Sequence, residues 1–528
     1  MRTAGRFGGS AVIVSGLCVW GIAEAFYGLS QVLGWRSSRH ALYALTGHFQ
    51  NPGPFGGFIA CVMAVAGAWL LRHSKDHPAG PTIYSVVNWT TTALAWVALA
   101  AGLLVLPASM SRAGWLGLAV ALGVEWMRSP IRSGMTMPIR SGMTVSEKPG
   151  MTKSCHSRAG GNLSRGVIGS LVVLTLLAGA FALKPDSALG RLHVWRMECR
   201  ALAARPWRGA GPGLGPWAYG EAQEAFFREH LETASPATVR VAGCPEYAFN
   251  EFLGLGVEYG LPALVLSILL IVCSILVLHH AGSPLAAGQT AWAVFACASY
   301  PLSVPQLRIL GTIFIIVAII AGTLQAAGSA APKTSLRSSL PCLPAWAPPA
   351  YEAAGGHGFR GGTACRLFAG LLPVISVVLL IGWMMLPRLS AAPGLTDREK
   401  FRELYAEGYA LHQAGEYEES TKLLEEGALL SCDPMFEIIL GKNAEALGNY
   451  VEAARLYEKA HYMVPSRLYP LVRLMRLQVR LGEDDAALET ARAIVSMPVN
   501  DRNAGMPRLH KETQVTLDSL ASILRTDG

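Results

Sequence analysis

The stretch YAFNEFLGLGVEYGLPALVLSILLIV, residues 247–272, joins a small polar cluster to an apolar run long enough to cross a bilayer. Asn250, Glu251 and Glu258 lie at the start of this run. Ionisable side chains at the mouth of a membrane helix are costly, and they commonly serve function. The stretch therefore predicts a membrane helix with a polar site at its beginning. The alternative for Glu251 and Glu258 is packing or capping at the helix entrance.

The composition of the whole chain is that of a membrane protein. Of 528 residues, 52% are hydrophobic and 15% are charged, with a mean hydropathy of +0.35. Roughly 25% of the residues in an ordinary soluble domain are charged. The net charge is +8, but the basic residues are scattered between apolar runs and form no continuous stripe. This distribution argues against nucleic acid as a partner.

Apolar stretches of roughly 17 to 25 residues, the length that crosses a bilayer, recur along the chain. We expect an all-α fold, with a polytopic transmembrane helical bundle in a domain over residues 1–386. The expected spans are nine, near residues 11–35, 54–71, 86–107, 112–127, 167–183, 252–278, 287–304, 309–326 and 367–386. The pair around Pro301 and Pro305 is alternatively one broken hairpin.

The distribution of Lys and Arg predicts the orientation, because cytoplasmic loops carry an excess of them. The stretch 128–166 holds seven basic residues and one acidic residue, so we place it in the cytoplasm. Counting spans outward puts the N-terminus and the loop 327–366 inside, and the loop 184–250 and everything after 387 outside. PIRSGMT occurs twice within 128–166, and we interpret this loop and 327–366 as disordered insertions.

The outer loop contains RPWRGAGPGLGPW at 205–217. A Gly- and Pro-rich turn beside Arg and aromatic residues can approach a sugar or a phosphate closely. Its candidate substrate-binding residues are Arg208, Gly211, Gly213 and Trp217. The alternative is an ordinary surface loop between two spans.

Four arginines break the expected charge pattern, because Arg36, Arg39, Arg112 and Arg308 lie at predicted outer ends of spans. A guanidinium holds phosphate oxygens through a planar fork. We therefore expect these residues to meet lipid headgroups or a lipid-linked diphosphate. The alternative is that each side chain extends toward ordinary headgroups.

Four elements in a fixed order resemble the O-antigen ligase and polymerase superfamily over about residues 10–325. They are TGHFQNPGPFGGFIA (46–60), SRAGWLGLAVAL (111–122), GRLHVWRMECRALAARPWRGAGPGLGPW (190–217) and EYAFNEFLGLGVEYGLPALVL (246–266). Members of this superfamily are multi-span bacterial enzymes. They take a glycan from undecaprenyl diphosphate and pass it to an acceptor outside the inner membrane.

The resemblance implies which residues carry the reaction. Arg112 matches the Arg of the Ser-Arg-x-x-Trp element, and Arg191 and Arg196 match the basic residues before the Gly-rich turn. Asn250 matches the Asn of the His-Asn-x-x-Leu element, but Phe249 replaces its histidine.

Without this histidine, either another residue serves as the base, or the reaction is different or has been lost. The candidates for the base are Glu246, Glu251 and Glu258, because partial burial raises a carboxyl pKa. Glu258 is expected to bind substrate, to orient a neighbouring Arg or to line the floor of the site.

The family chemistry uses a donor that already carries a good leaving group, so we expect no cofactor and no metal ion. The expected partners are an undecaprenyl-diphosphate-linked glycan, membrane lipids, and a lipid or protein acceptor. The acceptor alternatives are a lipid A core, a growing glycan and a protein. The resemblance places the protein in a bacterial inner membrane.

The tail at 397–528 has an internal repeat. Gly415, Gly448 and Gly482 recur at separations of 33 and 34 residues, which predicts an α-solenoid of three tetratricopeptide hairpins in the periplasm. Such an array binds a peptide or a partner protein, or alternatively serves as an architectural cap. The rival to the enzyme hypothesis is a non-catalytic, membrane-anchored scaffold for envelope polysaccharide assembly.

Two cysteines, Cys199 and Cys244, share the outer loop. In an oxidising compartment they are candidates for a disulfide that restrains it.

Overall fold

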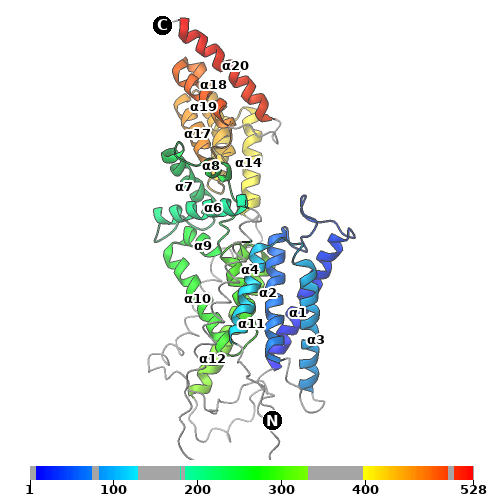
Figure 1. The fold of residues 1–528 in the computed structure, drawn as a ribbon. Coiled ribbons are helices and arrows are strands. Elements are labelled where there is room, and N and C mark those ends of the chain that lie inside the picture. The colour runs from blue at the N-terminus through cyan, green and yellow to red at the C-terminus, as the bar shows by residue number, and fades with distance from the viewer. Residues whose placement is uncertain are drawn as a thin grey trace, which may run out of the picture. The chain divides into compact units, whose positions relative to one another are not determined.

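The computed structural model of the chain describes residues 8–73, 83–128, 179, 185–330, 397–497 and 505–526. Within these ranges the protein forms eighteen α-helices and the 3-10 helix η2, with no strand (Figure 1). The all-α prediction is confirmed for these residues. The chain divides into unit 1, residues 1–183 and 269–380, and unit 2, residues 184–268 and 381–528.

Unit 1 is a helical bundle. Its described helices are α1 (Gly8–Val32), α2 (Pro52–His73), α3 (Ile83–Val105), α4 (Arg112–Arg128), the second part of α10 (Leu261–His280), α11 (Leu285–Ala296), η2 (Pro301–Ser303) and α12 (Pro305–Ala330).

Helix α2 forms the core of unit 1, in contact with α1, α3, α4 and α11 (Figure 1). In its most apolar window, 94% of the residues are buried within the protein. Glycines permit this enclosure, because a Cβ at Gly57 would lie 2.5 Å from the Phe295 ring. At the α4–α11 contact, a Cβ at Gly117 would lie 2.7 Å from the Ala291 carbonyl oxygen. Small residues allow helices to approach closely where lipid supplies no hydrophobic driving force.

Five described helices are long and apolar enough to cross a membrane, namely Ser10–Val32, Pro52–His73, Ser85–Val105, Leu261–His280 and Pro305–Gln325. They correspond to five of the nine expected spans. The expected span 112–127 is α4, with 17 residues, and the expected span 287–304 is α11, with 12 residues, followed by η2. The expected spans 167–183 and 367–386 lie outside the described residues, as do most of the loops 128–166 and 327–366.

The expected continuous span at 252–278 is wrong, because two helices occupy it. Helix α9 (Glu251–Tyr259) ends at Gly260, whose φ is 86°. The Gly260 N–H donates to the Gly256 carbonyl at 2.7 Å. A residue with this backbone conformation ends a helix, and glycine adopts it without a Cβ penalty. The membrane-length segment is α10.

Unit 2 contains the outer loop and the tail. Its described helices are α6 (Pro185–Ala204), α7 (Gly215–His230), α8 (Pro236–Val241), α9, the start of α10, α14 (Asp397–Ala414), α15 (Tyr417–Ala428), α16 (Met435–Ala446), α17 (Tyr450–Met463), α18 (Tyr469–Leu481), α19 (Asp484–Ser496) and α20 (Gly505–Thr526). Consecutive helices from α14 to α20 pack against each other.

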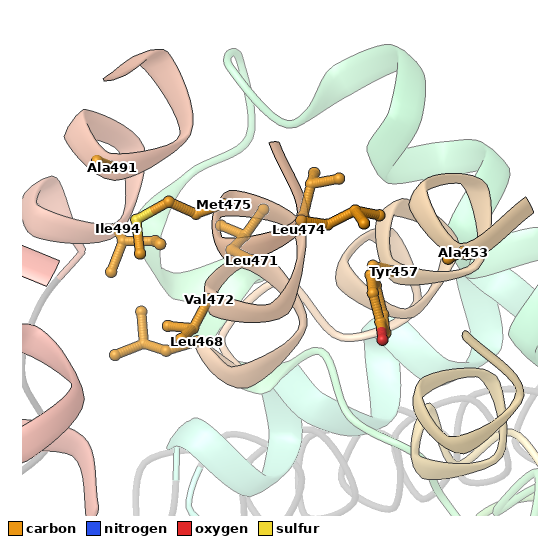
Figure 2. Close-up of a cluster of buried hydrophobic side chains, with 10 residues drawn as sticks. Ala453, Tyr457, Leu468, Leu471, Val472, Leu474, Met475, Ala491 and Ile494 are labelled. Carbon is orange, nitrogen blue, oxygen red and sulfur yellow. The ribbon is translucent and has the colours of Figure 1, made fainter. Parts of the chain in front are cut away.

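The repeated glycines close turns between consecutive helices of the tail. Gly415, Gly448 and Gly482 follow α14, α16 and α18, with φ values of 84°, 81° and 72°. In the core of the last repeats, Met475 of α18 lies between Tyr457 of α17 and Ile494 of α19 (Figure 2). Helical pairs at this period are therefore present. Their assignment as tetratricopeptide repeats stays a prediction.

Candidate functional site

The Gly-rich turn packs against the end of α9. The Ala210 N–H donates to the Val257 carbonyl at 2.7 Å, and the Gly211 N–H donates to the Glu258 carbonyl at 3.0 Å. The last carbonyls of a helix have no partner within the helix, so the turn supplies partners for two of them. Segments that are about fifty residues apart in sequence thereby form one backbone unit.

The glycines of this turn are required by close contacts. Gly209, Gly211 and Gly213 have φ values of 67°, 114° and 76°. A Cβ at Gly209 would lie 2.5 Å from the Tyr259 nitrogen, and a Cβ at Gly215 would lie 2.9 Å from Glu258 Oε1. The turn reaches α9 only because these side chains are absent.

Glu258 supports the turn from within. Its side chain is 2% exposed, and Oε2 accepts a hydrogen bond from the Gly213 N–H at 3.3 Å. Glu258 thus holds two predicted substrate-binding elements together, the turn and the end of α9. Its own contact with substrate stays a prediction.

The start of α9 is organised around Phe249 and Asn250. Phe249 has a φ of 51°, an unusual conformation for an aromatic residue, and its carbonyl accepts from Trp195 Nε1 at 3.2 Å. The Asn250 side chain accepts from the Leu253 N–H at 3.1 Å, which caps the helix. Glu251, in the first helical turn, is 5% exposed.

The two predicted arginines of α6 face different partners. The Arg191 guanidinium carbon lies 5.3 Å from the centre of the Phe249 ring, whereas that of Arg196 lies 4.7 Å from the Phe226 ring of α7. Arg191 therefore meets the start of α9 at Phe249. Five residues along a helix turn a side chain well away from its starting face, which is why the two arginines diverge.

The other predicted residues of unit 2 lie at its surface or beside the turn. Arg208 and Glu246 are exposed, and Trp217 is half-buried under the Arg205 guanidinium at 4.8 Å. The sequence analysis did not single out Arg205. The sequence feature that could have identified Arg205 is its position as the first residue of the Gly-rich stretch.

The predicted residues of unit 1 lie at helix ends. Arg36 follows α1, and its guanidinium carbon lies 4.8 Å from the Tyr27 ring, beside a surface pocket of about 360 Å³. Arg39 Nη1 donates to the His48 carbonyl at 3.1 Å. Arg112 begins α4, and Arg308 lies in the first turn of α12.

Two polar clusters of unit 1 escaped the sequence analysis. Glu24, 6% exposed within α1, accepts from His48 Nδ1 at 3.1 Å. Arg72 of α2 donates to Glu125 of α4 through Nε at 3.0 Å and Nη2 at 2.7 Å. The sequence feature that could have identified them is an acidic residue inside an apolar run. Glu24 is the one charged residue in 11–35, and Glu125 is the one acidic residue in 112–127.

The outer loop is joined covalently to the tail within unit 2. Cys244 forms a disulfide with Cys432, and Cys199 is a free, exposed cysteine. The expected pairing of Cys199 with Cys244 is therefore wrong. Cys199 lies on the exposed face of α6, while Cys244 belongs to a buried cluster with Cys432.

Charged and polar contacts reinforce this junction. Lys459 of α17 binds Glu221 of α7 at 2.9 Å and Glu437 of α16 at 2.8 Å. Burial acts to lower the pKa of Lys459, but the two carboxylates outweigh it and the pKa is raised. Gln223 of α7 donates to the carbonyl of Met463 and accepts from the Tyr219 hydroxyl at 2.6 Å. The outer loop and the array form one packed body.

No known protein family, curated protein or solved structure matches this chain. The family resemblance therefore rests on the four sequence elements and their order.

Proposed function

We propose that this protein is a membrane glycosyltransferase that moves a glycan from undecaprenyl diphosphate to an acceptor on the periplasmic side of a bacterial inner membrane. One observation carries the proposal. The turn at 205–217 and the segment 250–258, both elements of the family resemblance, pack together through Gly211 and Glu258. The exposed guanidinium groups of Arg205 and Arg208 beside this turn suit a diphosphate.

The chemistry requires charge neutralisation and a proton acceptor. Arg191 and Arg196 of unit 2 are the candidates to stabilise the negative charge that develops on the departing diphosphate, and the family resemblance makes Arg112 of unit 1 a further candidate. Glu246 or Glu251 accepts the proton of the acceptor hydroxyl. Glu251 is buried in the first turn of α9, at the start of the segment that packs against the Gly-rich turn. The donor already carries its leaving group, so the transfer proceeds without a metal ion or a cofactor.

The disulfide supports the outward orientation of unit 2. Disulfides persist in oxidising compartments such as the periplasm and are rare in the cytosol. Cys244 and Cys432 join the outer loop to the tail. Both segments then lie in the periplasm, as the charge pattern predicts. There the helical array presents a surface to a protein partner or to a protein acceptor.

The second candidate function is a non-catalytic, membrane-anchored tetratricopeptide scaffold for envelope polysaccharide assembly. Phe249 favours it, because an aromatic ring under Arg191 occupies the position of the family histidine. A scaffold needs the outer loop only as a rigid mount for the array. The disulfide and the Lys459 ion pairs provide such a mount.

Deletion of the gene separates the two functions. Lipopolysaccharide without O-chains identifies a ligase, a single repeat unit identifies a polymerase, and under-glycosylated proteins identify an oligosaccharyltransferase. Unchanged glycan pools, in a strain without a second copy of the enzyme, overturn the enzyme proposal.

Complementation then tests the site. Arg112→Gln and Arg196→Gln should insert normally and fail to restore transfer. Arg402→Gln, an exposed arginine of the tail, is the matched control and should restore it. A scaffold is insensitive to all three changes.

A further inference from the structure

Glu24 and His48 form a carboxylate–imidazole pair in unit 1. Both Glu24 oxygens lie 3.1 Å from His48 Nδ1, and Oε2 also accepts from the His48 backbone N–H at 3.3 Å. A carboxylate that receives two donors is an acceptor only. Nδ1 is therefore the donor in this contact, and in the neutral form of such an imidazole the lone pair is on Nε2.

The pair is held in place from three sides. Gln31 Oε1 accepts from the backbone N–H groups of Thr46 at 3.0 Å and Gly47 at 2.8 Å, which fixes the segment before His48. The Tyr27 ring lies 3.8 Å from the His48 ring, centre to centre. A ring held by a carboxylate, a neighbouring aromatic residue and a fixed backbone keeps one orientation.

Glu24 and His48 differ in solvent exposure, and this difference suits proton transfer by His48. The Glu24 side chain is 7% exposed, whereas that of His48 is 44% exposed. The carboxylate is thus shielded, and the imidazole is open to solvent. The same arrangement of base and orienting carboxylate activates hydroxyl groups in unrelated enzymes.

Two arginines contact residues of this region. Arg39 donates to the His48 carbonyl, and Arg36 lies over the other partner of the ring, Tyr27. The loop that carries His48 leads into α2, where the Gly53 carbonyl accepts from Ser111 Oγ at 2.9 Å, next to Arg112. Arg36 and Arg39 therefore lie in this region of unit 1, and Arg112 is the neighbour in sequence of a residue that contacts the start of α2. All three are predicted to bind a diphosphate.

We propose that His48 is the general base of the transfer and that Glu24 is its positioning residue, an inference that rests on the proposed function. His48 Nε2 takes the proton of the acceptor hydroxyl as its oxygen bonds to the anomeric carbon of the glycan. The bond between that carbon and the diphosphate oxygen breaks. The electron pair leaves on undecaprenyl diphosphate, and His48 then returns the proton to solvent. In this assignment His48 takes the place of Glu246 and Glu251 as the base of the proposed function.

The test uses full-length protein in proteoliposomes. The donor is undecaprenyl-diphosphate-linked oligosaccharide extracted from the deletion strain, and the acceptor is the membrane fraction of the same strain. His48→Asn keeps a donor at the Nδ1 position for Glu24 but removes the Nε2 lone pair. It should lower kcat by about 100-fold or more with an unchanged KM for the donor, because general bases contribute roughly 10² to 10⁴ in rate.

Imidazole rescue separates a chemical role from a structural one. Free imidazole should restore part of the activity of His48→Ala and none of that of Arg112→Gln. His40→Asn, in the same loop, is the matched control and should retain activity.

Three outcomes count against the assignment. Full activity of His48→Asn overturns it and leaves the proposed function intact. Loss of activity in His48→Asn without imidazole rescue of His48→Ala also overturns it, and makes the pair a structural link. No transfer by the wild-type protein overturns the proposed function itself.

Discussion

Cys244 and Cys432 are joined by a disulfide across 188 residues of sequence, with their Cα atoms 5.4 Å apart. One cysteine precedes α9 and the other lies between α15 and α16. The covalent link therefore connects the loop that carries the predicted site to the helical array.

We expect mass spectrometry of a non-reduced digest to identify a Cys244–Cys432 peptide pair. Cys199 is free and exposed, so it should react with a maleimide before reduction. Replacement of Cys244 and Cys432 by Ser should destabilise unit 2 by about 2–4 kcal/mol, while Cys199→Ser should have little effect. A Cys199–Cys244 peptide pair would contradict the structure.

The Gly-rich turn should not tolerate a side chain at Gly209. Gly209→Ala places a Cβ about 2.5 Å from the Tyr259 nitrogen at a φ of 67°, and the left-handed conformation alone costs roughly 1–2 kcal/mol. Hydrogen exchange of the peptides at 205–217 and 250–260 should increase.

Gly243→Ala is the control for this experiment, because no atom lies within 4 Å of its added Cβ. Equal exchange in the two variants would show that the close approach is not needed.

Unit 2 should lose stability in acid through His461. Burial lowers the pKa of His461 to about 4 from 6.5, so the unfolded chain binds this proton at a higher pH than the folded protein does. The stability from the neutral imidazole is complete above pH 6.5 and is lost as the pH falls toward 4. The loss at pH 5 is about 2 kcal/mol.

Hydrogen exchange of α17, corrected for the intrinsic effect of pH, measures this loss. Burial also lowers the pKa of His193, which adds to the effect in the same direction. His461→Leu should flatten the pH dependence, and His230→Leu, at a half-exposed position of α7, is the control. Equal pH dependence in wild type and His461→Leu would refute the assignment.

Glycan transfer should continue in EDTA, because the donor carries its own leaving group and arginines neutralise the diphosphate. The measurement is the transfer rate in proteoliposomes with and without chelator. Abolition by EDTA, with recovery on addition of a divalent metal ion, would contradict a metal-independent reaction.

Local patterns in the sequence predicted much of the fold. Apolar runs of membrane length predicted five helices that the structure contains, and the period of Gly415, Gly448 and Gly482 predicted the helical pairs of the tail. These features depend on residues that are close in sequence, where length and periodicity are informative.

Contacts between distant segments were not predictable in the same way. The partner of Cys244 lies in a segment that was treated as a separate domain. The Glu24–His48 pair joins a helix to the loop that follows it, and neither residue belongs to a spacing pattern. The break at Gly260 depends on the Gly-rich turn, since the Leu261 N–H donates to the Pro206 carbonyl at 2.7 Å.

Most of the helices that contact α2 follow it in the chain. The central helix of unit 1 is therefore synthesised before most of its neighbours. The glycine-lined face of α2 gains its contact with α11 (Leu285–Ala296) only when that helix has been synthesised. Arg72 likewise gains its partner only when Glu125 has been synthesised. A polar group without a partner is costly in hydrocarbon. The core of unit 1 is therefore complete only once α11 is present, and a chain interrupted before Leu285 lacks the contact between Phe295 and Gly57.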